Sequence, residues 1–123
     1  MLNPVVLGLC VTIAGAIGTL FRYLFNFTTF GVFDLKLSTF LVNMIGAYLI
    51  GLFTKLYQLQ ELSSDLYVIF STGFLGGFTT FSGLALDVMT SFQNESVIPP
   101  VIYGTLVVFL GAASTFLGYR THR

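Results

Sequence analysis

Residues 73–83 read Gly-Phe-Leu-Gly-Gly-Phe-Thr-Thr-Phe-Ser-Gly and place glycines, hydroxyls and aromatic rings inside a long apolar run. Because such a run predicts a membrane span, these residues predict a helix that is interrupted within the membrane. Backbone groups freed in hydrocarbon need protein, an ion or water as partners, since each group left without one costs several kcal/mol. We therefore expect an ion site at the interruption.

Neutral hydrogen-bonding side chains also occur in the other apolar runs. Asn43 is the only amide deep within any of them, and it is expected either to bond a neighbouring helix or to line a polar path. Ser114 and Thr115 are expected either to line that path or to bond their own backbone four residues back. Such groups suit a small ion that must lose water without being trapped. The predicted interior set comprises Asn43, Thr79, Thr80, Ser82, Tyr103, Ser114 and Thr115, together with Phe78 and Phe81.

This chain has few residues of the types that carry out catalysis. There is one histidine, His122 in the tail, and one cysteine, Cys10, and no pair of carboxylates lies within the apolar runs. Acid–base, nucleophilic and metal-dependent catalysis each need such groups close together. We therefore do not expect an enzyme, and nucleic acid is not an expected partner.

The elements that must position these groups are helices that cross a membrane. The 123 residues are 55% hydrophobic and 8% charged, with a mean hydropathy of +0.91, which is typical of a multi-pass membrane protein. Charges bound four uncharged runs of 21, 18, 21 and 24 residues, and about 20 helical residues cross the hydrocarbon core. The sequence predicts an all-α membrane protein with one domain, residues 1–123, both termini on one side, and spans at about 4–25, 37–56, 64–90 and 97–120.

Local signals indicate where these helices begin and how they pack. Asn3 before Pro4 predicts a capped start of the first span, and Ser63 predicts the N-cap of the third span. Small residues in the first span recur at spacings of three or four, which predicts a contact face. Because four spans make a thin bundle, we expect packing against a copy of the chain or a close relative. The small residues are Gly8, Thr12, Gly15 or Ala16, and Thr19, with Ala14 and Gly18 as a further pair.

Basic residues give little preference for one orientation in the membrane. Arg22 lies one turn before the end of the first span, where it is expected either to reach the headgroups or to face a vestibule and attract anions. Three basic residues lie on the side of the termini and two on the other: Lys55, Arg120 and Arg123 against Arg22 and Lys36. This near balance predicts insertion in both directions, from which an antiparallel dimer can form.

Three motifs on three successive spans resemble the Fluc (CrcB-type) family of fluoride channels over nearly the whole chain. The motifs are Gly15-Ala16-Ile17-Gly18-Thr19-Leu20-Phe21-Arg22-Tyr23, Val42-Asn43-Met44-Ile45-Gly46 and residues 73–82. Their order, in a chain of the family's size, makes the resemblance specific. It implies a fluoride-selective channel in the plasma membrane, which lets fluoride leave the cell passively and so lowers its toxicity in the cytoplasm.

The resemblance also implies an assembly and its ion sites. It implies an antiparallel, dual-topology dimer held by a structural sodium ion, whose ligands would be carbonyls of the broken third span at Gly76 and Thr79. Two fluoride pathways would run through the dimer. A phenyl ring has a positive edge, so that Phe81 can hold an anion edge-on. The residues implied to line the pathway are Asn43, Thr80, Phe81 and Ser82.

One position departs from the family pattern. Leu84 stands where the family usually has a second phenylalanine, three residues after Phe81. The chain is therefore expected to form either a homodimer with an altered aromatic lining or a heterodimer with a paralogous subunit, in which one pathway is degenerate or does not conduct. Two hypotheses from different functional classes are a small multidrug exporter, whose first span would need an acid that is missing here, and an assembly subunit without transport of its own.

Overall fold

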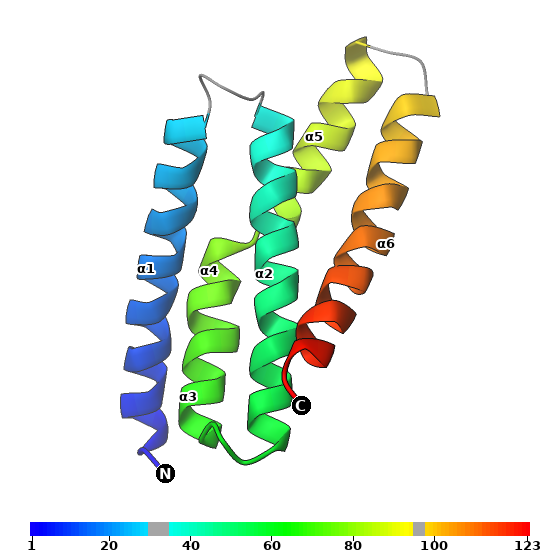
Figure 1. The fold of residues 1–123 in the computed structure, drawn as a ribbon. Helices are drawn as coiled ribbons and strands as arrows, with labels where there is room; N and C mark the ends of the chain where they lie inside the picture. Colours follow the sequence, from blue (N-terminus) through cyan, green and yellow to red (C-terminus); the bar gives the residue numbers. More distant parts are fainter. Residues whose placement is uncertain (30–34, 95–97) are drawn as a thin grey trace.

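The computed structural model describes residues 1–29, 35–94 and 98–123, and all regular structure in these segments is helical (Figure 1). Four helical segments are long and apolar enough to cross a membrane: Pro4–Thr28, Leu37–Gln58, Ser64–Gln93 and Ile98–Thr121. The prediction of an all-α protein with four spans is confirmed. Both chain termini lie at the same end of the bundle (Figure 1).

Helix α1 (Pro4–Thr29) begins where the sequence predicts but ends later. The Asn3 side chain caps its start and accepts a hydrogen bond from the Val5 backbone nitrogen at 2.9 Å. The predicted span ends near residue 25, but the helix continues through Asn26 because the next helix-breaking residue, Gly31, comes further on. The polar residues that follow residue 25 therefore belong to the end of a helix.

The third span, which the sequence predicts as a helix with one interruption, consists of four helical pieces in the structure. It consists of α3 (Ser64–Val68), the π-helical segment η1 (Ile69–Leu75), the short α4 (Gly76–Phe78) and α5 (Phe81–Asn94). Ser63 caps α3 by accepting a hydrogen bond from the Leu66 nitrogen at 3.3 Å. The predicted interruption is confirmed at Thr79 and Thr80, which are not helical, whereas nothing in the sequence pattern predicts the π-helical segment before it.

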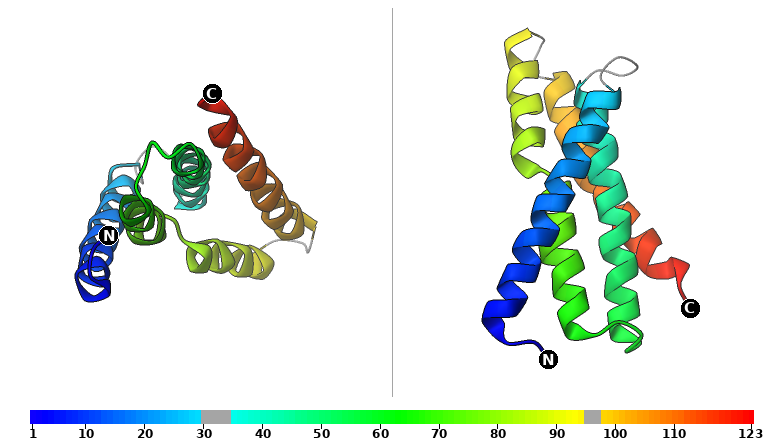
Figure 2. Two further views of the ribbon diagram at one scale, coloured as in Figure 1. Left: turned by 90° about the horizontal axis from the view of Figure 1, so that it is seen from below. Right: turned by 90° about the vertical axis from the view of Figure 1, so that its left-hand side faces the viewer.

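Glycines let α1 approach the third span backbone to backbone. A side chain at Gly18 would collide with the Phe74 carbonyl, and a side chain at Gly77 would collide with the Gly15 carbonyl. The predicted contact face therefore packs within the chain, against η1 and α4. Gly8, which the sequence places on the same face, lies outside this contact. No neighbouring atom lies within 4 Å of where a Cβ at Gly8 would be, because α1 and the third span diverge toward that end (Figure 2).

Helices α2 (Leu35–Gln58) and α6 (Ile98–Thr121) form the second close pair. Gly51 lies against the Thr115 carbonyl and Gly118 against the Tyr48 carbonyl, so that here too the backbones nearly touch. Viewed along the bundle, α3 and α4 lie between α1 and α2, and after the break α5 runs toward α6 (Figure 2). The break thus lies where three elements meet, beside a small core of Val42, Leu75 and Phe78.

The glycine contacts predict opposite effects for two substitutions on the same helix. We expect Gly18→Ala to destabilise the protein by about 1–3 kcal/mol, because the added methyl group forces α1 away from Phe74. Gly8→Ala should leave stability unchanged or raise it slightly, since alanine favours a helix. Thermal unfolding in detergent measures both variants, and equal stability of the two would contradict the close contact at Gly18.

Candidate functional site

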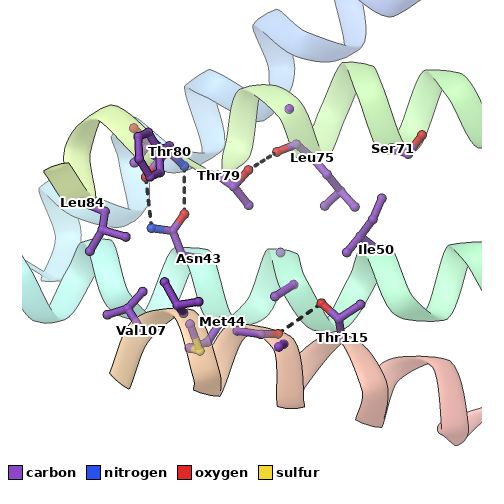
Figure 3. A pocket seen from close by; sticks show the side chains of 17 residues that line it. Asn43, Met44, Ile50, Ser71, Leu75, Thr79, Thr80, Leu84, Val107 and Thr115 are labelled. Carbon is purple, nitrogen blue, oxygen red and sulfur yellow. Dashed lines mark hydrogen bonds between the residues drawn. The ribbon is translucent and has the colours of Figure 1, made fainter. Parts of the chain in front are cut away.

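A pair of hydrogen bonds joins Asn43 on α2 to the interruption of the third span (Figure 3). The Asn43 amide nitrogen donates to the Thr80 carbonyl oxygen at 3.1 Å, and the Thr80 backbone nitrogen donates to the Asn43 amide oxygen at 2.8 Å. The side-chain amide thereby replaces the backbone partners that Thr80 would have in a continuous helix. Asn43 thus bonds a neighbouring span, which is one of the two roles expected for it.

The hydrogen bonds between Asn43 and Thr80 also leave a backbone carbonyl on the preceding turn without its usual donor. In a continuous helix the Thr80 N–H would bond the Gly76 carbonyl, but here it is directed to Asn43. No residue in the described part of the chain donates a hydrogen bond to the Gly76 carbonyl, and Gly76 is exposed. Thr79 is extended (φ −84°, ψ 158°), and its backbone nitrogen and hydroxyl both donate to the Leu75 carbonyl, at 2.9 and 2.8 Å.

Thr80 also begins the helix that follows the break. Its hydroxyl accepts a hydrogen bond from the Gly83 backbone nitrogen at 3.0 Å and lies 3.2 Å from the Ser82 hydroxyl. This is the geometry of an N-cap, so that α5 starts directly at the interruption. The positive end of the α5 dipole and two hydroxyl groups therefore lie together beside Asn43.

A groove of about 430 Å³ runs along the interruption between α2, the third span and α6 (Figure 3). Its polar lining consists of a line of neutral groups, and its other walls are apolar, with Leu84 and Val107 at the end nearer Thr80 (Figure 3). Phe81 also borders the groove, although 82% of its surface is exposed. The neutral polar side chains are Asn43, Ser71, Thr79, Thr80 and Thr115.

A second cavity, of about 360 Å³, lies at the other side of Thr80 and is called the vestibule below. Unlike the groove, it is lined by charged side chains, one basic and one acidic. Thr80 borders both cavities, so both lie beside the interruption held by Asn43. The vestibule is lined by Arg22, Asn26, Thr39, Thr80, Ser82, Gly83, Leu86 and Asp87.

The structure brings most of the predicted residues to these two cavities. Gly76, Thr79, Asn43, Thr80, Phe81 and Thr115 line the groove, and Arg22, Ser82 and again Thr80 line the vestibule. Three predicted residues line neither cavity: Phe78, which belongs to the buried core, Tyr103 and Ser114.

Tyr103 and Ser114 both lie on α6. Tyr103 is half-buried on α6, and the Ser114 hydroxyl donates to the Met44 sulfur at 3.9 Å. The neighbouring Thr115 hydroxyl donates to the Gly111 carbonyl of its own helix at 3.1 Å, which is one of the two roles expected for it.

Three polar residues of the vestibule are not among the site residues that the sequence predicts. The sequence pattern places Asn26 in a connection and Asp87 at the end of the third span. Asp87 instead lies within α5 and is only 6% exposed, and an ionisable residue inside a span is a functional candidate by default. Thr39 could have been predicted from the sequence, because it precedes Asn43 by four residues and therefore lies on the same face of the helix.

Comparison with known proteins gives consistent matches over most of the chain. The sequence model of the family described as "CrcB-like protein, Camphor Resistance (CrcB)" matches residues 9–119. A protein of Allorhizobium ampelinum named "Fluoride-specific ion channel FluC" is 34% identical over 116 residues, which cover 92% of this chain and 93% of the relative. A protein of Thermus thermophilus with the same name is 37% identical over 114 residues, covering 91% of each chain.

The paired bonds to Thr80 predict a measurable defect in Asn43→Leu. Removing the amide leaves the Thr80 N–H and C=O without partners, and each such group costs about 1–3 kcal/mol when it is buried. We expect lower thermal stability and faster hydrogen exchange at the Thr80 amide. Thr12→Val is the control, because the Thr12 hydroxyl bonds only the Gly8 carbonyl of its own helix. Unchanged exchange at Thr80 in Asn43→Leu would show that the break holds without the amide.

Proposed function

We propose that this chain, which belongs to the CrcB-like protein family, is a fluoride channel through which fluoride leaves the cell passively. It is a multi-pass protein of the plasma membrane with four membrane-spanning helices. Its relatives are named as ion channels, in agreement with the expectation that the chain is not an enzyme. One structural observation supports the proposal above all: a helix break, lined by neutral donors, lies between two cavities that share Thr80 as a lining residue.

The proposed path leads from the vestibule through the interruption into the groove. Arg22 raises the local concentration of anions at the vestibule. At the interruption Asn43 uses one of its two amide hydrogens for the Thr80 carbonyl, which leaves the other as a donor for an anion. The Ser82 hydroxyl and the edge of the Phe81 ring add further partners of positive character. None of the groups at the interruption carries a full charge, so they replace water around the ion without holding it tightly.

A sodium ion at the carbonyls of Gly76 and Thr79 is part of the proposal. Two observations fit it: the Gly76 carbonyl has lost its helical partner to Asn43, and Gly76 is exposed on the surface of the single chain. Carbonyls of an unwound turn are suitable ligands for sodium. When bound, the ion would supply a positive charge shared by two subunits.

The same exposed surface supports the proposed antiparallel dimer. Phe81, next to the interruption, is 82% exposed in the single chain. A large apolar ring that contacts an ion without its water would be expected to be shielded from solvent. A second subunit would cover it. Leu84 lines the groove in place of an aromatic residue, so a heterodimer with a paralogous subunit is proposed beside the homodimer.

The proposed activity predicts ion-selective efflux. Purified protein in liposomes should release fluoride rapidly and chloride no faster than protein-free liposomes do. Asn43→Leu should slow fluoride efflux about tenfold or more, because one hydrogen bond to a charged ligand is lost. Thr12→Val serves again as the control. Equal release of both anions, or of neither, would reject the fluoride channel.

The proposed sodium site predicts dependence on the cation. Prolonged dialysis that replaces sodium by a large organic cation should reduce fluoride efflux and weaken the dimer, and returned sodium should restore both. Size-exclusion chromatography and efflux measured on the same samples follow the change. If neither the oligomer size nor the flux responds to sodium, the sodium ion does not hold this assembly together.

A further inference from the structure

The half-buried side chain of Ser71 makes no hydrogen bond to any described residue. It lies in η1 and lines the groove at the end away from Asn43 (Figure 3). Its oxygen is accessible rather than sealed within the protein, since it is not one of the fully buried polar atoms that lack a partner. The hydroxyl is therefore available to bond whatever occupies that end of the groove.

The π-helical conformation of η1 explains why this hydroxyl is available. Threonine and serine hydroxyls in an α-helix often donate to the carbonyl four residues back, as those of Thr12 and Thr54 do in α1 and α2. In a π-helix the backbone hydrogen bonds span five residues instead, which changes where that carbonyl lies relative to the hydroxyl. Thr72, the other hydroxyl residue of η1, also makes no such bond, but it is exposed and lines neither cavity.

Two other hydroxyls that line the groove already use their hydrogen atoms. The Thr79 hydroxyl donates to the Leu75 carbonyl at 2.8 Å, and the Thr115 hydroxyl donates to the Gly111 carbonyl at 3.1 Å. A hydroxyl has a single hydrogen, so each of these two could donate to an anion only by giving up that bond. What they offer otherwise is oxygen lone pairs, which do not bind an anion. Ser71 differs from both because its hydrogen has no such acceptor.

We propose that the Ser71 hydroxyl donates a hydrogen bond to fluoride and forms a second anion site, at the end of the groove away from Asn43. The site rests on the proposed channel function, in which the N–H of Asn43 that Thr80 leaves unused serves the ion first. Between the two donors the lining includes the apolar side chain of Leu75 (Figure 3). An ion that leaves Asn43 therefore needs a further donor, and a single neutral hydroxyl binds it weakly enough to release it.

The test is the initial rate of fluoride efflux from liposomes at fluoride concentrations below saturation, with thermal stability measured on the same preparations. Ser71→Ala removes the donor, and we expect the rate to fall about tenfold. Stability should change little, because the hydroxyl has no partner in the described chain to lose. Ser71→Thr keeps a hydroxyl and should retain most of the rate. Thr72→Ala is the matched control, since it removes the neighbouring hydroxyl of η1, which lines neither cavity.

A wild-type rate in Ser71→Ala would overturn the proposal. An equal loss in Thr72→Ala, or a loss that Ser71→Thr shares, would also overturn it, because flux would then depend on the conformation of η1 and not on a hydroxyl in the groove. If Ser71→Ala does not fold, Ser71→Cys decides, since a thiol is a weak donor of similar size and a wild-type rate there would reject the site. If the wild type itself carries no fluoride, the proposed channel function fails together with the Ser71 site, whereas a conducting wild type with an unaffected Ser71→Ala removes the Ser71 site alone.

Discussion

The paired hydrogen bonds between Asn43 and Thr80 are the interaction on which the rest of the site depends. A membrane span can be interrupted only where its freed backbone groups find partners, because the hydrocarbon offers none. The amide satisfies the N–H and the C=O of the same residue and thereby holds Thr79 and Thr80 out of the helix. It also takes the Thr80 N–H from the Gly76 carbonyl, so one side chain stabilises the break and leaves that carbonyl without its helical donor.

Close packing by glycine brings the amide and the break together. Gly15, Gly18 and Gly77 let α1 lie against the third span, and Gly51 and Gly118 do the same for α2 and α6. These contacts leave the interruption between two cavities rather than inside a filled core. The charged residues Arg22 and Asp87 stay in the vestibule, while the groove keeps only neutral polar groups.

Much of this arrangement could be predicted because it depends on local patterns in the sequence. Four uncharged runs of about a helix length across the membrane determine four spans, since an uninterrupted apolar run has no other stable state in a bilayer. The glycines and hydroxyls of residues 73–83 marked the interruption, and Asn43 stood out as the only amide deep in a run. The caps at Asn3 and Ser63 followed from side-chain preferences that act within three residues.

The partners of these residues were decided only by the tertiary structure. Sequence separation carries no information on which helix faces meet, so nothing in the chain indicated that Asn43 bonds Thr80, 37 residues away. The same reason explains why the pattern puts Asn26 in a connection and Asp87 at the end of a span: periodicity describes one helix at a time. Their common cavity depends on how α1 packs against the third span, which the glycine contacts determine.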